Sequence, residues 1–391
     1  MPTADFAFGP PHAGKTSALV VVALMLLAAC GDDATARSWR SLGQVPAPAA
    51  TELNHTPLVV SGGRALVGTA DGVWARSLDG SGSWSLAGLA GVSVFATRRH
   101  PDLDATLFVA GMPAEAREAP PFYRSDDGGN TWVGSAAFPR NPFDQSSEPF
   151  FDLAIAPDDA DRLYGNLSGP SVAISTDGGL TWTLANGETE VFFGDPCVLH
   201  VLDTVPGRLY QGCEAPLDNA WVATHDIDAQ DPFTLSNFTF VAGGPDFALE
   251  NRRPNATASS AARPGTLYVG LEGALIALDI EGFDFVFRAQ EGDAEHPYAY
   301  VGAIWADPED ANHLLFGGGI NGENEFLALF ETRDHGRTLQ RLSPPVALVD
   351  PAVEQIVPAS DDAIAVLISH VEDLGDESRR LSLYLLEPLP Q

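Results

Sequence analysis

One eight-residue pattern recurs along this chain at nearly constant spacing. Residues 125–132 and 175–182 both read S-x-D-x-G-x-T-W, and residues 77–84 and 332–339 contain degenerate copies of this pattern. The copies begin at 77, 125, 175 and 332, so the first three lie 48 and 50 residues apart, and the last gap of 157 is close to three further periods. A period near 50 is typical of chains that stack similar units, most often the blades of a propeller.

Degenerate copies and a second repeated feature keep the same period. Residues 224–226 follow the third copy after 49 residues, and residues 277–279, which keep only the aspartate, follow after 53 more. A turn containing Pro, Asp or Gly, followed by a short β-run, also recurs. It occurs at residues 62–68, 101–108, 157–165, 206–210, 264–268, 307–317 and 361–367. Together with the apolar residues before each turn, these runs predict seven β-hairpins.

Each unit therefore contains four strands, with an Asp-containing turn between the third and the fourth. Four antiparallel strands repeated radially predict an all-β β-propeller, and we expect seven blades, with six or eight as the alternatives. The seventh unit ends after a third strand at 381–386, whereas residues 38–42 resemble the fourth strand of the other units. We expect this N-terminal strand to complete the last blade and remove an open edge, so that residues 38–391 form a single domain.

The repeated pattern resembles the Asp-box, or bacterial neuraminidase repeat, of sialidases, sortilin-type receptors and photosystem-assembly propellers. In those families the turn lies away from the ligand face, so the resemblance implies a structural role rather than a catalytic one. The chemistry agrees, because the aspartate can accept backbone N–H bonds, the glycine permits positive φ and the tryptophan packs between sheets. The matching residues are Ser77, Asp79, Trp84, Ser125, Asp127, Gly129, Thr131, Trp132, Ser175, Asp177, Gly179, Thr181, Trp182, Thr332, Asp334, Gly336 and Thr338.

The first thirty residues have the features of an export signal. An apolar run at 18–27 follows Lys15, and the sequence Leu-Ala-Ala-Cys that ends at Cys30 has the pattern of a bacterial lipoprotein signal. Residues 1–29 would then be a signal peptide, Cys30 the lipidated residue and residues 30–37 a short tether. The alternative is ordinary cleavage after residues 34–36, which would release the protein. Because Gly31 rather than aspartate follows Cys30, the outer membrane or the cell surface is favoured.

The other two cysteines are placed symmetrically about a turn. Cys197 and Cys213 each lie eight residues from Val205, which a hairpin would bring close to the separation that a disulfide needs. Export to an oxidising compartment makes such a bridge stable. The alternative is two separate buried thiols. No Cys-x-x-Cys spacing occurs, so no metal site is predicted here.

The charge of the chain restricts its partners. The sequence has 53 acidic and 21 basic residues, a formal net charge of −32, which argues against nucleic acid and against direct contact with anionic lipid. The acid-rich residues 226–231 lack the glycine that an EF-hand requires at its sixth position. We therefore predict no cofactor. The alternative is a bound Ca²⁺ ion, which so acidic a surface would attract. We expect a monomer that touches the membrane only through the lipid on Cys30.

Propeller ligands usually bind on the face formed by the loops that lead into the first strand of each blade. The candidate residues in these loops are Arg252, Arg253, His296, Tyr298 and Tyr300. The adjacent arginines could hold an anion, or they could form salt bridges with neighbouring acidic loops. The tyrosines offer aromatic surface, or they pack at the start of a strand.

Three functions are compatible with these features. The first is a non-catalytic, lipid-anchored propeller that binds a protein or a carbohydrate at the cell envelope. The second is a sialidase-like exo-glycosidase; that resemblance would imply a Phe/Tyr-Arg-Ile-Pro segment with the first of three clamp arginines, and no such segment occurs. We therefore assign no catalytic residue. The third is an envelope assembly factor resembling the photosystem-assembly propellers, whose arginine-rich patch contrasts with the acidity of this chain.

Overall fold

The computed structural model describes the greater part of the chain after residue 36. The described residues are 37–50, 57–113, 118–140, 147, 149–167, 169, 171–185, 197–202, 204–215, 219–227, 238–243, 253–279, 282–289, 299–320, 327–360, 362–373 and 378–389. Cys30 and the predicted signal peptide lie outside them. The described residues contain no helix with the length and apolarity needed to cross a bilayer. Residues 37–391 form one unit, and the helices and strands assigned among its described residues are all β-strands.

The strands of the first four blades follow one another in sequence. Blade 1 contains β2 (Leu58–Ser61), β3 (Arg64–Thr69), β4 (Gly72–Ser77) and β5 (Ser85–Gly88). Blade 2 contains β6 (Val92–Arg99), β7 (Leu107–Pro113), β8 (Phe122–Ser125) and β9 (Val133–Gly134). Blade 3 contains β10 (Asp152–Ala156), β11 (Asp159–Asn166), β12 (Val172–Ser175) and β13 (Thr183–Leu184). Blade 4 contains β14 (Val198–Leu202), β15 (Val205–Ala215), β16 (Asn219–Asp226) and β17 (Phe238–Gly243).

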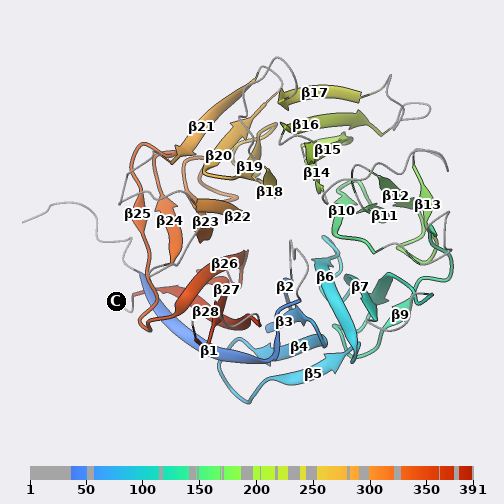
Figure 1. Ribbon diagram of the computed structural model, residues 1–391, viewed down its shortest axis with the longest axis horizontal. Coiled ribbons are helices and arrows are strands. Elements are labelled where there is room, and N and C mark those ends of the chain that lie inside the picture. The colour runs from blue at the N-terminus through green and yellow to red at the C-terminus, as the bar shows by residue number, and fades with distance from the viewer. Residues whose placement is uncertain are drawn as a thin grey trace, which may run out of the picture. The chain divides into compact units, whose positions relative to one another are not determined.

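The remaining three blades follow the same order until the last strand. Blade 5 contains β18 (Pro254–Ser259), β19 (Leu267–Leu271), β20 (Ala274–Leu278) and β21 (Phe283–Arg288). Blade 6 contains β22 (Ala299–Ala306), β23 (Leu314–Ile320), β24 (Ala328–Thr332) and β25 (Gln340–Arg341). Blade 7 contains β26 (Val349–Pro358), β27 (Ile364–Val371), β28 (Arg380–Pro388) and β1 (Arg37–Pro48). The predicted seven-bladed propeller of four-stranded antiparallel sheets is confirmed (Figure 1).

The N-terminal strand closes the ring as predicted. β1 pairs antiparallel with β28, and Trp39 is opposite Leu386 in the register. An ion pair of 2.6 Å between Arg40 and Glu387 joins the same two strands. Innermost strand β26 also contacts β2, so the first and last blades are neighbours. β1 begins at Arg37, one residue before the predicted start of the domain. The N-terminal strand β1 therefore supplies the fourth strand of blade 7, beside the three C-terminal strands β26, β27 and β28.

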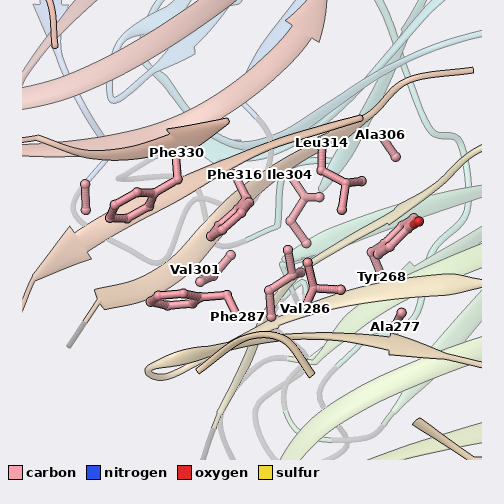
Figure 2. Close-up of a cluster of buried hydrophobic side chains, with 12 residues drawn as sticks. Tyr268, Ala277, Val286, Phe287, Val301, Ile304, Ala306, Leu314, Phe316 and Phe330 are labelled. Carbon is pink, nitrogen blue, oxygen red and sulfur yellow. The ribbon is translucent and has the colours of Figure 1, made fainter. Parts of the chain in front are cut away.

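Apolar side chains fill the space between neighbouring blades. The cluster between blades 5 and 6 shows the arrangement: Phe287 of β21 faces Phe316 and Phe330 of blade 6, with ring centroids 5.5 and 5.8 Å apart (Figure 2). Alternating apolar residues on strands of both blades point into this space. Burial of such contacts between every pair of blades is the main source of stability for the ring.

The Asp-box turns join the third and fourth strands of blades 1, 2, 3 and 6. In blade 2, Asp127 accepts hydrogen bonds from the backbone N–H of Thr131 at 2.8 Å and from its hydroxyl at 2.7 Å. The hydroxyl of Ser125 donates to Asp127 at 2.8 Å and accepts from the N–H of Gly129. These bonds, led by the Thr131 hydroxyl, lower the pKa of Asp127 to about 2. The carboxylate is therefore committed to holding its own turn.

The same bonds recur in blades 3 and 6. Asp177 accepts from the N–H and hydroxyl of Thr181 at 2.8 and 2.6 Å, and Asp334 accepts from Thr338 at 2.8 Å in both cases. The worn copy in blade 1 keeps a shorter set, in which Asp79 accepts from the N–H of Ser81 at 2.7 Å.

The tryptophans that end the first three copies differ in burial. Trp182 is 4% exposed and Trp84 is 8% exposed, so both belong to the core between blades. Trp132 is half-buried rather than fully buried, which differs from the prediction for a complete copy of the motif. The difference comes from the neighbouring residues. Trp132 packs against Gly88 of blade 1, which has no side chain. Trp182 packs against two aromatic rings, those of Phe122 and Phe150.

A disulfide joins Cys197 to Cys213, as the symmetric spacing predicts. Val198 of β14 is opposite Gly212 of β15, so the two cysteines occupy the next facing positions of this hairpin, with their Cα atoms 4.5 Å apart. Both side chains are buried. The bridge fastens the start of the innermost strand of blade 4 to its neighbour.

Candidate functional site

The first strand of every blade lines a central channel. These strands are β2, β6, β10, β14, β18, β22 and β26, and they surround the axis of the ring (Figure 1). The channel contains a cavity of about 400 Å³. Its lining comprises residues 58–60, 97–99, 152–155, 198–201, 255–257, 302–304 and 355–358. A cavity of this volume is within the range of small-molecule sites, and it is the candidate functional site of the propeller.

An ion pair between blades 2 and 3 lies in this cavity. Nη2 of Arg98, on β6, is 2.6 Å from Oδ1 of Asp152, the first residue of β10. The side chain of Asp152 is buried, and its two oxygens also accept the N–H groups of Leu153 at 2.8 Å and Leu199 at 2.9 Å. A buried carboxylate needs such compensation, because an unpaired charge would be costly away from water. Asp152 is therefore saturated by its partners within the protein.

A histidine and a serine connect the next two blades. Nε2 of His200, on β14, is 2.9 Å from the hydroxyl of Ser259 on β18. Burial and, to a lesser extent, the positive charge of Arg98 lower the pKa of His200 to about 4, so the imidazole is neutral at neutral pH. A neutral imidazole has one donor and one acceptor nitrogen. Nδ1 of His200 makes no hydrogen bond within the described residues, so it can serve a ligand.

Side chains in the channel also form hydrogen bonds with exposed backbone groups of the innermost strands. An innermost strand has a row of backbone N–H and C=O groups with no further strand to pair with. Oε1 of Gln355 accepts the N–H of Leu58 from the next blade at 2.5 Å, as Asp152 does for blade 4. The amide nitrogen of Asn255 is buried and has no partner among the described residues. The channel thus combines groups fixed by the fold with a few polar groups still available.

The described residues that line the cavity include one carboxyl group. Glycoside hydrolysis by the common mechanisms requires two carboxyl groups on either side of the scissile bond. Asp152 is the one acidic residue among the described residues that line the cavity, and it is already neutralised by Arg98. Across the described part of the chain, no cluster of three or more His, Cys, Asp or Glu residues is placed to hold a metal ion.

We call the face where the innermost strands begin the upper face, and two of the predicted ligand residues meet there. Arg253 directly precedes β18, and Tyr300 lies in β22. Glu272, between β19 and β20, donates its N–H to the carbonyl of Arg253 at 3.2 Å and forms an isolated antiparallel bridge with Tyr300. Arg252, His296 and Tyr298 lie outside the described residues. Loops of blades 5 and 6 are thus joined through backbone contacts at this face.

A second group of polar side chains on the upper face was not predicted from the sequence. Nη1 of Arg379, before β28, is 2.7 Å from Oδ2 of Asp350 on β26, and its Nε donates to the hydroxyl of Ser369 at 2.9 Å. Ser369 in turn donates to Glu354, whose pKa is raised by burial. The sequence gives no local signal for this network, because its members come from three separate strands or loops of blade 7.

Comparison with known proteins identifies the fold and leaves the family open. No protein-family model and no curated protein matches this sequence. Among solved structures, the chain is similar to a GH74 enzyme of Niastella koreensis, with a TM-score of 0.60 and 18% identity over 86% of this chain and 54% of the enzyme. The chain thus spans about half the length of that enzyme.

Two further structures are similar over almost their whole length. YCF48 from Cyanidioschyzon merolae has a TM-score of 0.55 and 15% identity, covering 90% of this chain and 99% of its own. A structure of YCF48 bound to D1 peptide has a TM-score of 0.52 and 12% identity, covering 90% of this chain and 97% of its own. At such identities the similarity establishes the fold alone: this chain is a seven-bladed β-propeller structurally related to GH74 and YCF48 propellers.

Proposed function

We propose that this chain is a non-catalytic propeller that is exported to the cell envelope, is anchored there by a lipid on Cys30, and binds a protein or glycan partner in its central channel. The observation that carries the proposal is the state of the central cavity. Its polar groups are held in place by neighbouring blades, yet its carboxylate, Asp152, is already bonded to Arg98 and to two backbone N–H groups. Such a cavity can recognise a ligand without supplying an acid and a base.

The available groups indicate the chemistry of the partner. The positive charge of Arg98 is offset by Asp152, and the imidazole of His200 is neutral at neutral pH. The amide of Asn255 adds a further neutral donor. Neutral donors and acceptors suit the amide groups of a peptide or the hydroxyl groups of a glycan better than a free ion.

The similar structures support a protein partner in particular. One YCF48 structure contains a bound D1 peptide, and its propeller corresponds to nearly all of this chain. The GH74 enzyme corresponds over about half of its own length, so its activity gives weaker support for hydrolysis here. A protein segment is therefore the partner that we place first, and a glycan is the alternative.

The disulfide supports the proposed location. Disulfides persist in the oxidising compartments outside the cytoplasm, where reduced glutathione does not act on them. The bridge between Cys197 and Cys213 is consistent with export. The lipid on Cys30 rests on the sequence pattern at residues 27–30, with release after ordinary cleavage as the alternative.

Binding assays with channel variants test the proposed function. The purified protein is screened against peptide and glycan arrays, and the affinity of each hit is then measured by calorimetry. We expect His200→Ala and Asn255→Ala to weaken binding by about tenfold, since each removes one buried hydrogen bond to the partner. Arg341→Ala, an exposed residue of β25 that lines neither the channel nor another cavity, serves as the control and should leave the affinity unchanged.

A hydrolytic assay tests whether the protein is non-catalytic. The same preparation is incubated with a fluorogenic sialoside and with a panel of polysaccharides, and product release is followed. We expect no turnover. Turnover that Asp152→Asn abolishes, in a variant that keeps its unfolding midpoint, would overturn the non-catalytic assignment and favour a glycosidase.

A further inference from the structure

A second cavity lies on the opposite face, between blades 5 and 6. It has a volume of about 370 Å³ and is formed where the β18–β19, β22–β23 and β24–β25 turns meet. Its lining consists of Arg263, Asn312, Arg333, Asp334, His335 and Arg337. Three arginines in one hollow depart from the composition of the chain, in which acidic residues outnumber basic ones by 53 to 21. This concentration of positive charge therefore calls for a local explanation.

The acidic residue of the lining does not pair with these arginines. Asp334 accepts the N–H and the hydroxyl of Thr338, each at 2.8 Å, as the aspartate of an Asp-box turn does. Arg333 forms an ion pair of 2.8 Å with Glu331. Within the part of the chain that the structure describes, neither Arg263 nor Arg337 forms an ion pair. Two guanidinium groups at this cavity thus have no carboxylate partner among the described residues.

His335 occupies a backbone position that favours glycine. Its φ is +56°, whereas the equivalent positions of the other three Asp-box turns are Gly80, Gly128 and Gly178, with φ of +83°, +70° and +68°. A side chain with a Cβ atom is disfavoured in this left-handed region, and such strain is found most often where the side chain has a use. The imidazole is thus held at the cavity despite a local steric cost.

A buried polar atom next to the cavity, Nε2 of His335, lacks a hydrogen-bond partner among the described residues. The ring of His335 lies 5.9 Å from that of Tyr268, whose hydroxyl is at the margin of the hydrophobic cluster (Figure 2). Burial raises the pKa of Tyr268, and the charge of Arg263 and a hydrogen bond from it act in the opposite direction, so this guanidinium is close to the hydroxyl. Burial, followed by the charge of Arg263, lowers the pKa of His335. Since buried polar groups are normally hydrogen-bonded, the Nε2 atom of His335 indicates a missing partner.

We infer that this cavity binds a small molecule that carries a phosphate or sulfate group. Guanidinium groups present paired N–H donors that match two oxygens of a tetrahedral oxyanion, so Arg263 and Arg337 would hold the charged group. The side-chain amide of Asn312 supplies a neutral donor from a third turn. The cavity is large enough for a sugar-sized remainder beside the anion, near the lower end of the range for small-molecule sites.

Calorimetric titration of the purified protein at low ionic strength tests this inference. The probes are inorganic phosphate, inorganic sulfate, a hexose 6-phosphate and a hexose 6-sulfate, which distinguish a phosphate source from a sulfate source. We expect saturable binding of at least one probe, weakened at least about tenfold by Arg263→Ala and by Arg337→Ala, because each removes a charge-assisted contact. The control is Arg341→Ala, an exposed residue of β25 outside the cavity, which should leave the affinity unchanged.

His335→Gly separates binding from folding. It restores the glycine of the other copies, so the thermal midpoint should not fall, while the affinity for the anion weakens. A lack of saturable binding for all four probes up to about 10 mM, beyond the range of a weak specific site, would overturn the inference. An equal loss with Arg341→Ala would also overturn it, since general charge attraction would then suffice. Binding of an acidic peptide alone, with none of the four small anions bound, would assign the surface to a protein partner instead.

Discussion

Replacing Trp182 with alanine is expected to lower the free energy of unfolding by about 3–5 kcal/mol, the usual cost of removing a buried aromatic side chain from a core. Trp182 is 4% exposed. Its ring lies 5.0 Å from that of Phe122, in blade 2, and 4.6 Å from that of Phe150. Its Nε1 donates to the carbonyl of Gly179 at 3.0 Å, so the indole also fastens the Asp-box turn. Rigid aromatic neighbours on two sides leave little room for the cavity to collapse.

Trp132 provides a matched control, because it ends a complete copy of the same motif one blade earlier. It is half-buried, and its Nε1 has no hydrogen-bond partner among the described residues. It covers Gly88 rather than an aromatic ring. Trp132→Ala should therefore cost about 1–2.5 kcal/mol, a part of the value for full burial of a large side chain. The difference between the two substitutions comes from the blade interface and not from the motif.

Urea unfolding followed by circular dichroism measures both substitutions without relying on tryptophan fluorescence. The free energy is obtained from the midpoint and slope of each curve, and an unchanged slope shows that the compactness of the two states is the same. Calorimetric midpoints give an independent ranking. Equal losses in the two variants, or a loss below about 1 kcal/mol for Trp182→Ala, would contradict the assignment of Trp182 to a tightly packed core.

Three further predictions concern the anchor, the bridge and acid stability. Cys30→Ala should move the protein from the membrane fraction to the soluble fraction; a wild type that takes up no palmitate analogue would contradict lipidation. Reduction of Cys197–Cys213, which closes a loop with a sequence separation of 16, should lower stability by roughly 3 kcal/mol; two free thiols in the denatured, unreduced protein would contradict the bridge. Burial has the largest single effect on Glu331 and would raise its pKa, but the hydrogen bond from His313 and the positive charges of Arg333 and Arg37 together outweigh it, so the pKa of Glu331 is lowered. Its stabilisation is therefore complete above the ordinary glutamate pKa and is lost as pH falls through the lowered value, and Glu331→Gln should remove this acid sensitivity in unfolding curves recorded at a series of pH values.

The blades could be predicted from the sequence because their determinants are local. An Asp-box turn contains its own donors and acceptors within eight residues, as the bonds of Asp127 and Asp177 show. Closure of the ring could also be predicted from the sequence, since Trp39 keeps the phase of the repeat and β1 supplies the strand that blade 7 lacks. The different burial of Trp132 and Trp182 could not be predicted from the sequence, because it depends on which residue of the preceding blade faces each indole.

The central site could not be predicted because its members come from different blades. Arg98, Asp152 and His200 are each about one period apart in the sequence, and none belongs to a local motif. Packing of blade 2 against blade 3 brings the guanidinium of Arg98 to the carboxylate of Asp152. Of the residues expected to face a ligand, Arg253 and Tyr300 meet at one edge of the upper face through Glu272, and this contact also joins two blades.

The Asp-box turn of blade 6 shows how a scaffold element can gain a second use. Its fixed residues, Thr332, Asp334 and Thr338, keep the hydrogen bonds that hold the turn. The variable positions between them are free to change, and here they carry His335 and Arg337 toward the turn of blade 5 that presents Arg263. The pattern in the sequence shows the histidine, but its meaning depends on an arginine some seventy residues earlier. A propeller face collects turns from neighbouring blades, so a motif with a purely structural role in one blade can contribute binding groups in another.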